Sequence, residues 1–432
     1  MDNAQVEEVF GDGGAPEGAG EGGPVTAKDR IGSLDFIRGI AVMGILAANI
    51  VAFGQPFAAY MYPAAFLTEH GETSNWLLIV QYVLIDGKMR GLFTLLFGAG
   101  LYLFMERAWG RGESRMLQMW RLLILLGFGL IHFFLIWAGD ILFAYALTGF
   151  VVVPMLKLGA KSQLWLGLIG YLAGTLFYAF FLSMPYLIAE TEMGEAPAYA
   201  ESRAGMEEGM AAALSDGATE TALIKSGDYA GFISHKLDVH AWDPLVNIGL
   251  FIWETLPLML IGVALYRLGF FSGGFSKRKM IGWGWLGLIL GGGMYLAIGL
   301  WLKATGFTYY GMLGAFVGWS AIPQLMMVLG MAALMVAYSP AWTGWLAERV
   351  RAAGRAAFTN YLGTSIVMLF IMHGWALGLF GQLNRPELYL LTALMWALML
   401  LWSKPWLDRF RYGPLEWLWR CMTYRKMFAL RR

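Results

Sequence analysis

Long apolar runs constrain this chain more than any other feature. A helix needs ~20 mostly apolar residues to cross hydrocarbon ~30 Å thick, because it rises ~1.5 Å per residue. The segments that meet this requirement are Leu34–Gly54, Met89–Glu106, Leu117–Gly139, Ile141–Leu158, Leu164–Ile188, Leu245–Leu268, Ile281–Leu302, Ser320–Tyr338, Phe358–Phe380 and Leu388–Trp406. The sequence therefore predicts an all-α, polytopic transmembrane helical bundle of about ten spanning helices, with further interfacial helices.

Composition supports a membrane protein and excludes other classes. The chain is 58% hydrophobic and 14% charged, whereas about 25% of residues are charged in soluble domains. A net charge of +1 does not provide the basic surface that nucleic acid requires. The single cysteine, Cys421, cannot form an intramolecular disulfide, and no Cys/His spacing resembles a zinc site. We therefore expect no nucleic-acid partner and no metal.

The distribution of Lys and Arg among the connecting loops indicates the orientation. Basic residues gather in alternate loops, and such loops are retained in the cytoplasm. These residues are Arg107, Arg111, Arg115, Arg121, Lys157, Lys161, Arg267, Lys277, Arg278, Lys279, Arg349, Arg351, Arg355, Arg409, Arg411, Arg425, Lys426, Arg431 and Arg432. We expect a multi-pass membrane protein with cytoplasmic N- and C-termini.

The same pattern divides the chain into five parts. They are a disordered cytoplasmic tail at 1–30, helices 1–5 at 31–188, an extracytoplasmic (periplasmic) loop at 189–243, helices 6–10 at 244–412, and a basic cytoplasmic segment at 413–432. Because the tail shows no apolar run of the kind a signal peptide has, we expect the first helix to remain as an anchor. The long loop holds either an amphipathic helix around Ala204–Leu214 or a flexible tether. The segment Thr343–Ala356 reads as an interfacial helix.

Ionisable residues inside spanning helices cost about 2.5–3.5 kcal/mol each and are therefore candidate functional residues. In the first helix, Asp35 and Arg38 are three residues apart, and Asn49 follows in nearly the same register. The three residues form a polar stripe along one face. The structural alternative is that Asp35 pairs with Arg38 at the inner interface while Asn49 bonds a neighbouring helix.

A second group of polar residues falls in the outer half of the predicted bundle. His132 is followed by Asp140 in a tight turn, and Glu254 and His373 lie at similar depth in later helices. A histidine beside a carboxylate can act as a general base. It can equally be a proton relay or an inert hydrogen-bonded pair.

The remaining histidines are predicted to lie in outer loops. His70 precedes the second spanning helix, and His235 and His240 are in the long loop. Solvated loop histidines are usually without function, which is the default expectation for these three.

Six separated motifs occur in order along the chain: RIGSLDFIRGIAVMGILAANI, DGKMRGLFTLLFGAG, HFFLIWAGDILFAYALTG, WETLPLMLIG, GRAAFTNYLGTSIV and RYGPLEWLWRCMTYRK. Together they resemble the bacterial YeiB-like family of membrane proteins (domain of unknown function 418), and the resemblance implies a location in the bacterial inner (plasma) membrane. The resemblance covers nearly the whole chain outside the tail and much of the long loop. More distantly, LDFIRGIAVMGILAAN and FTLLFGAG are similar to the transmembrane acyltransferase superfamily, which includes heparan-α-glucosaminide N-acetyltransferase.

The distant resemblance implies an activity and a set of site residues. In that superfamily acyl-CoA enters from the cytoplasm, and a histidine near the far side helps to move the acyl group to a sugar or another hydroxyl or amine. Carried over by position, Asp35, Arg38 and Asn49 would bind the acyl-CoA co-substrate. His70 lies between the first two spanning helices, as the catalytic histidine of the relatives does, although its spacing differs. His132 is the competing candidate.

Three classes of function follow. The leading hypothesis is a membrane-embedded acyltransferase with acyl-CoA as donor and an envelope sugar or lipid as acceptor. His132 or His70 would remove the acceptor proton, and Glu254 or Asp140 would orient the imidazole. The alternatives are a small-molecule, lipid or proton-coupled transporter, and a noncatalytic protein that binds lipid or quinone. Membrane lipids are expected partners in each case, and the sequence leaves a homo-oligomer open.

Overall fold

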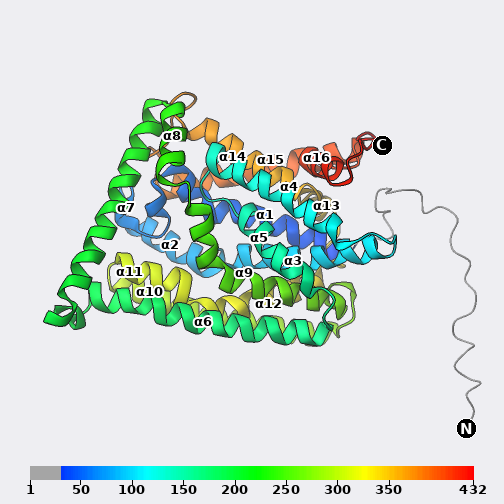
Figure 1. Ribbon diagram of the computed structural model, residues 1–432, viewed down its shortest axis with the longest axis horizontal. Coiled ribbons are helices and arrows are strands. Elements are labelled where there is room, and N and C mark those ends of the chain that lie inside the picture. The colour runs from blue at the N-terminus through cyan, green and yellow to red at the C-terminus, as the bar shows by residue number, and fades with distance from the viewer. Residues whose placement is uncertain (1–30) are drawn as a thin grey trace, which may run out of the picture. The chain divides into compact units, whose positions relative to one another are not determined.

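The computed structural model describes residues 31–432, and these residues fold as an all-α protein (Figure 1). Its helices are α1 Gly32–Gly54, α2 Glu72–Leu84, α3 Lys88–Trp109, α4 Arg115–Ile131, α5 Leu142–Met155, α6 Ala160–Glu190, α7 Ala200–Ser226, α8 Tyr229–Val239, α9 Asp243–Arg267, α10 Lys277–Ala304, α11 Tyr309–Leu313, α12 Ala321–Tyr338, α13 Trp345–Arg355, α14 Ala357–Met372, α15 Arg385–Arg409 and α16 Pro414–Tyr424. Two π-helical turns, His132–Ile136 and Gly314–Trp319, interrupt this series. The tail predicted at 1–30 lies outside the described residues.

Among residues 31–432, eight helices are long and apolar enough to cross a membrane, or nine if α13 and α14, bent by 84°, form one span. The difference from the predicted ten arises mainly at α5. At 14 residues, α5 reaches only ~21 Å at ~1.5 Å per residue. The second span begins earlier than predicted. Helices α2 and α3 together form one stretch, Glu72–Trp109, that is long and apolar enough to cross a membrane.

The interior of the bundle is formed by α1, α3, α9 and α12, whose apolar stretches are largely buried. The packing of α3 against α9 depends on glycine, since a Cβ on Gly98 would overlap the carbonyl of Met259 and one on Gly262 would overlap that of Leu95. Close backbone approach of this kind is typical of helices packed in membranes. The α3–α9 contact brings the polar residues of both helices together.

The outer helices of the bundle expose large apolar side chains. On α6 these include Trp165, Ile169 and Phe180, and on α10 they include Trp283 and Ile289. Extended apolar surface of this kind is costly in water and natural against lipid. It agrees with a multi-spanning membrane protein.

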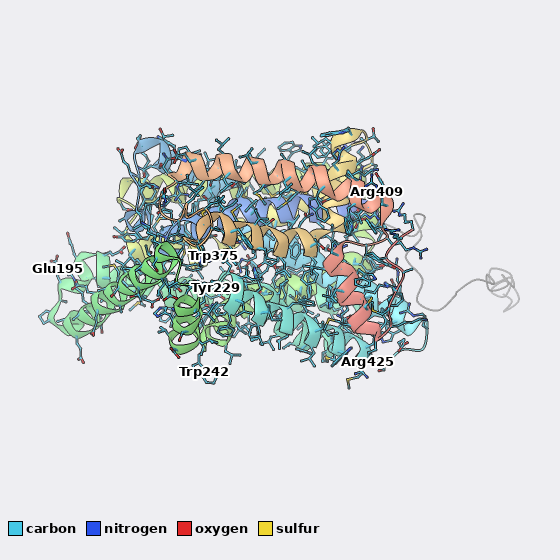
Figure 2. All side chains as sticks on the ribbon, turned by 90° about the horizontal axis from the view of Figure 1, so that it is seen from above. Glu195, Tyr229, Trp242, Trp375, Arg409 and Arg425 are labelled. Atoms are coloured by element: carbon cyan, nitrogen blue, oxygen red, sulfur yellow. The ribbon has the colours of Figure 1, made fainter. Side chains whose placement is uncertain are left out.

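Helices α7 and α8 lie at one end of the bundle, and α13 and α16 lie at the other (Figure 1). Figure 2 shows Glu195 and Trp242 at the first end and Arg409 and Arg425 at the second. The predicted inner loops meet at this second end. Arg267 donates to the carbonyl of Leu158 and to Gln163 Oε1, and Arg121 lies 4.2 Å from the ring centroid of Trp419. The basic loops thus share one end, as their alternation along the chain requires.

Both predicted accessory helices are present. The long loop contains α7, of 27 residues, and α8, of 11 residues. The segment is therefore helical and longer than Ala204–Leu214, but Ile224 is the only buried residue of α7, so the predicted amphipathic character is not seen. The predicted interfacial segment Thr343–Ala356 forms α13, which packs closely on α1 because Gly354 lies against the carbonyl of Asp35.

Candidate functional site

A break between α2 and α3 places several ionisable side chains inside the bundle. Asp86 and Gly87 interrupt the helix, and Lys88 and Arg90 follow in the first turn of α3. Gly87 has φ 76°, and a Cβ there would overlap the side-chain amide of Gln324. Glycine therefore meets two requirements at this position, a left-handed conformation and close contact with α12.

Glu254 of α9 forms an ion pair with Arg90 inside the bundle. Arg90 Nη2 lies 2.7 Å from Glu254 Oε2, and Gln324 Nε2 donates to Glu254 Oε1 at 2.8 Å. The Arg90 guanidinium also lies 4.9 Å from the ring centroid of Phe251. Both carboxylate oxygens are thus bonded by α3 and α12, as a charge in a low-dielectric interior requires.

Asp86 belongs to a second polar network, which extends to α15. Gln81 Nε2 donates to Asp86 Oδ1 at 3.0 Å, and Gln81 Oε1 accepts from Arg385 Nη1 at 2.9 Å and from the Tyr389 hydroxyl. Arg385 Nε also donates to His70 Nε2 at 3.3 Å. One oxygen of Asp86, Oδ2, is buried and makes no hydrogen bond within the described structure. Together these contacts connect α2, α15 and the segment that precedes α2.

The surroundings of His70 favour its neutral form. Burial and, secondarily, the charge of Arg385 lower the pKa of His70 to about 4. Its ring also lies against Phe66, with centroids 4.7 Å apart. The structure thus places His70 in the Arg385 network.

His132 and Asp140 form a buried pair. His132 opens the π-helical turn that ends α4, and Asp140 lies in the short link to α5. His132 Nδ1 is 2.8 Å from Asp140 Oδ1, while Asp140 Oδ2 accepts from the Phe143 amide at 2.7 Å. Because an ionised carboxylate only accepts hydrogen bonds, Nδ1 carries a proton, and in the neutral imidazole Nε2 carries the lone pair.

The second nitrogen of His132, Nε2, is buried and has no hydrogen-bond partner among the described residues. The imidazole is fully buried and lies 5.2 Å from the ring of Tyr361 and 6.2 Å from that of Trp137, measured between centroids. A carboxylate on one nitrogen and a free lone pair on the other is the arrangement of a general base.

A cavity of about 60 Å³ is lined by residues of α7 and α8 and by Trp137, whose ring centroid lies 6.2 Å from that of His132. Trp137, Glu220, Lys236 and His373 are among its lining residues. Lys236 Nζ donates to the carbonyl of Phe133, the residue after His132, at 3.1 Å. Trp137 therefore contacts the cavity on one side and the His132 ring on the other.

The ionisable groups of this cavity are buried, which favours their neutral forms. Burial lowers the pKa of Lys236 to about 8, opposed in part by the charge of Glu220. Burial and the nearby Lys236 lower the pKa of His373 to about 4. Nδ1 of His373 is buried without a hydrogen-bond partner among the described residues. Of these two side chains, His373 therefore offers the cavity a nitrogen atom without a partner among the described residues, whereas Lys236 Nζ is bonded to the Phe133 carbonyl.

The structure brings only some of the predicted site residues together. His132 meets Asp140, so Asp140 rather than Glu254 holds the imidazole. Within the described structure, Glu254 forms its ion pair with Arg90, not with His132. Arg38 Nη1 lies 3.6 Å from Asp35 Oδ1 on α1, and Asn49 is half-buried about three turns beyond Arg38 on the same helix.

Sequence reasoning missed the polar residues at the helix break and their partners on α12 and α15. These are Gln81, Asp86, Lys88, Arg90, Gln324 and Arg385. The signal was present, since the apolar run NWLLIVQYVLI continues directly into DGKMRG and then into GLFTLLFGAG. Charges between two apolar runs of this kind indicate a broken helix within the membrane rather than a loop outside it.

The fold and these buried polar groups define a multi-spanning helical membrane protein. Comparison with known proteins gives its family. The chain is 32% identical to uncharacterized protein YeiB of Escherichia coli (strain K12) over 419 residues, which is 92% of this chain and 97% of the relative. It is 28% identical over 411 residues to uncharacterized protein YxaH of Bacillus subtilis (strain 168), covering 93% and 96% of the two chains.

A third relative, an uncharacterized 39.9 kDa protein encoded in the amylase 3' region of Bacillus acidopullulyticus, is 25% identical over 409 residues. Those residues cover 94% of this chain and 97% of that protein. Residues 265–426 match the family described as "Protein of unknown function (DUF418)". The chain therefore belongs to the YeiB-like DUF418 family of bacterial proteins. No solved structure matches it.

Proposed function

We propose that this protein is a membrane-embedded acyltransferase, which moves an acyl group from a cytoplasmic acyl-CoA to a hydroxyl or amine of an envelope acceptor. The observation that carries the proposal is the His132–Asp140 pair, with Nδ1 bonded to the carboxylate and Nε2 free. A buried histidine with one fixed tautomer can take a proton from an acceptor group.

The proposed step balances as a simple acyl exchange. His132 Nε2 removes the proton of the acceptor hydroxyl or amine, and the oxygen or nitrogen attacks the thioester carbonyl. The carbon–sulfur bond then breaks, and the CoA thiolate takes the proton back from the imidazolium. Asp140 stabilises the imidazolium while it exists.

The two substrates would approach from opposite ends. We assign the end that carries α13 and α16 to the cytoplasm, because the basic loops gather there. Arg38, paired with Asp35 on α1, would bind CoA phosphates on that side. The acceptor would enter by the cavity under α7 and α8, and the volume of about 60 Å³ means that Trp137 must move to admit it.

Binding of the donor is the first test of this proposal. Protein purified in detergent should be thermally stabilised by acyl-CoA, because a ligand that binds only the folded state raises apparent stability. Arg38→Gln should weaken that stabilisation, whereas Lys404→Gln, on the exposed face of α15, should leave it unchanged. If acyl-CoA does not stabilise the wild-type protein at any concentration tested, CoA is not the donor.

The Arg90–Glu254 pair favours a second candidate, proton-coupled transport of a small molecule. Ion pairs inside membrane helices often mark proton or substrate pathways. Glu254 would then exchange protons while Arg90 and Gln324 stabilise its charged form. Uptake into liposomes that depends on the pH gradient, without any covalent product, would support transport and contradict acyl transfer.

A further inference from the structure

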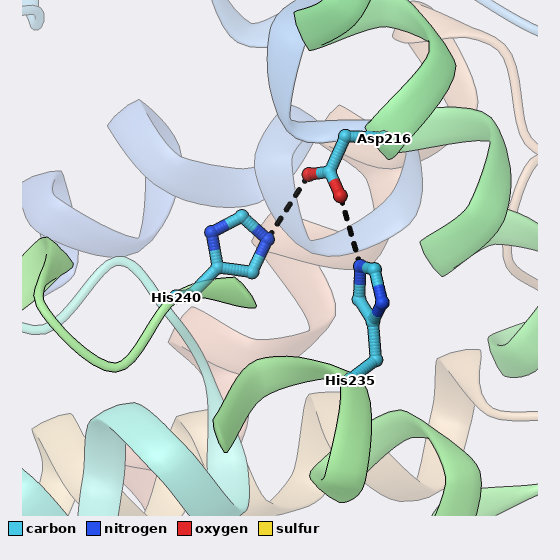
Figure 3. Close-up of side chains that lie close together, drawn as sticks. All are labelled: Asp216, His235 and His240. Atoms are coloured by element: carbon cyan, nitrogen blue, oxygen red, sulfur yellow. Dashed lines mark hydrogen bonds and ion pairs between the residues drawn. The ribbon is translucent and has the colours of Figure 1, made fainter. Parts of the chain in front are cut away.

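Three side chains at the end of the bundle formed by α7 and α8 converge on one point (Figure 3). Asp216 comes from α7, His235 from α8, and His240 from the residue that ends α8. His235 Nε2 is 2.9 Å from Asp216 Oδ1, and His240 Nε2 is 3.0 Å from Asp216 Oδ2. All three ligand atoms lie within 4.8 Å of one another.

His240 is oriented by a further carboxylate. Its Nδ1 lies 2.8 Å from Oδ2 of Asp243, the first residue of α9. That contact places a proton on Nδ1, and in the neutral imidazole, the form that binds a metal, the lone pair of Nε2 is directed at the cluster. Nε2 is buried and makes no hydrogen bond of acceptable geometry within the described structure. Histidines that bind metals are commonly held by a carboxylate in this way.

A fourth donor lies one helical turn from Asp216. Glu220 is on the same face of α7, and its Oε1 is 3.9 Å from His240 Nε2. The side chains of the cluster are only partly accessible, between 16% for His235 and 29% for Asp216. The junction of α7, α8 and α9 therefore holds two imidazoles and one or two carboxylates. Water reaches these groups only in part.

We propose that Asp216, His235 and His240 bind a Zn²⁺ ion, with Glu220 as the nearest group to complete four ligands. Imidazole nitrogens select zinc and its neighbours in the first transition row over Ca²⁺ and Mg²⁺, which prefer all-oxygen sites. Tetrahedral zinc holds its ligands ~2.0–2.2 Å from the metal, so neighbouring N and O atoms lie about 3.3 Å apart. The observed 2.9 and 3.0 Å, from the two histidines to the two oxygens of Asp216, are a few tenths of an ångström shorter than this, and no two of the three ligand atoms are more than 4.8 Å apart.

The ion would join α7 to α8 and to the start of α9. This differs from the sequence-based expectation, which assigned no metal and no role to His235 or His240. The site escaped that reasoning because Asp216 is 19 residues from His235, and only the α7–α8 hairpin brings them together. Since Glu220 also lines the cavity beside Trp137, the ion would fix one wall of that cavity.

Zinc binding is tested on the full-length protein, purified in detergent with its polyhistidine tag removed. Zinc per chain is measured by mass spectrometry after reloading, and affinity by competition with a chromophoric chelator. We expect one zinc ion per wild-type chain. His235→Gln and His240→Gln should bind at least about 10-fold more weakly, and Asp243→Asn about 10- to 100-fold more weakly because it orients His240.

The matched control is His70→Gln. It also replaces a histidine with glutamine, but His70 lies outside the cluster, so this variant should keep wild-type zinc affinity. Zinc should also raise the melting temperature of wild type and not that of His240→Gln. The proposal is wrong if wild-type protein retains no zinc, or if both histidine variants bind it as tightly as wild type. It is also wrong if Ca²⁺ or Mg²⁺ raises the melting temperature of wild type as much as zinc does, and raises that of the histidine variants equally.

Discussion

His132 Nδ1 lies 2.8 Å from Asp140 Oδ1, and the opposite nitrogen of the same ring has no hydrogen-bond partner in the described structure. The pair is formed by a π-helical turn at the end of α4 and by the short link to α5. Asp140 is itself held, because its second oxygen accepts from the Phe143 amide. The carboxylate, the imidazole and its free lone pair are thus fixed in position before any substrate arrives, and this preorganisation is what general-base chemistry requires.

Asp140→Asn tests whether the carboxylate sets the state of His132. The amide can donate to Nδ1, which would move the ring proton to Nε2 and remove the lone pair from the reacting side. We expect acyl transfer to fall about 10²- to 10⁴-fold, with the melting temperature little changed. Transfer is measured as labelled product per unit of folded protein. Unchanged turnover in Asp140→Asn would show that the carboxylate has no such role.

Glu254→Gln tests the ion pair inside the bundle. The substitution keeps the shape and the bond from Gln324 but leaves Arg90 without its counter-charge. Breaking a fully buried pair costs about 3–5 kcal/mol, and the cost here should be lower because the Arg90 side chain is 27% exposed. We expect a clearly lower melting temperature in detergent, partly restored in Arg90→Met/Glu254→Gln. The control is Asp408→Asn, which breaks the exposed Lys404–Asp408 pair and should cost at most about 1 kcal/mol. Equal effects of Glu254→Gln and Asp408→Asn would contradict a buried pair.

Gly87→Ala tests the helix break. Alanine is strained at φ 76°, and its Cβ would overlap Gln324, which bonds Glu254. We expect a loss of stability of about 1–3 kcal/mol, read as a lower melting temperature. Gly293→Ala on α10 is the control, because no atom lies within 4 Å of its added Cβ. That control should be neutral or slightly stabilising, and a neutral Gly87→Ala would mean that the break tolerates a side chain.

His373 gives a pH dependence of stability. Its pKa is lowered to about 4 in the folded protein, mainly by burial, from an ordinary value of 6.5. As pH falls, His373 therefore binds its proton in the unfolded chain before it does so in the folded protein. Its contribution to the free energy of unfolding is complete above pH 6.5 and is lost progressively down to about pH 4. Melting temperatures from pH 7.5 to 4 should fall less steeply in His373→Gln than in wild type. Parallel profiles would assign the acid sensitivity to other groups, of which His70 is the next candidate.

Local features of the sequence predicted local features of the structure. Apolar runs indicated the spanning helices because hydrophobicity acts along each segment by itself. The tight Gly139–Asp140 turn made His132 and Asp140 neighbours, and the structure has them bonded. Helix α5, Leu142–Met155, is shorter than the predicted Ile141–Leu158. An apolar run shows which residues avoid water, but it does not show at which residue the helix ends.

Partners that come from distant helices were not predicted. Glu254 and Arg90 are 164 residues apart, and Arg385 and Gln81 are 304 residues apart. These pairs depend on how α3 packs on α9 and α15 on α2, which a single sequence does not specify. His132 and Glu254 were expected at similar depth, and the structure gives them different partners, Asp140 and Arg90, because equal depth in the membrane does not make two side chains neighbours.

The most direct test of the acyltransferase proposal compares wild type with His132→Gln in proteoliposomes supplied with labelled acyl-CoA and a mixture of envelope acceptors. The account predicts a covalently acylated product with wild-type protein. It predicts a loss of about 10²- to 10⁴-fold in His132→Gln at equal amounts of folded protein. Product formed at the wild-type rate by His132→Gln would contradict the assignment of His132 as the base.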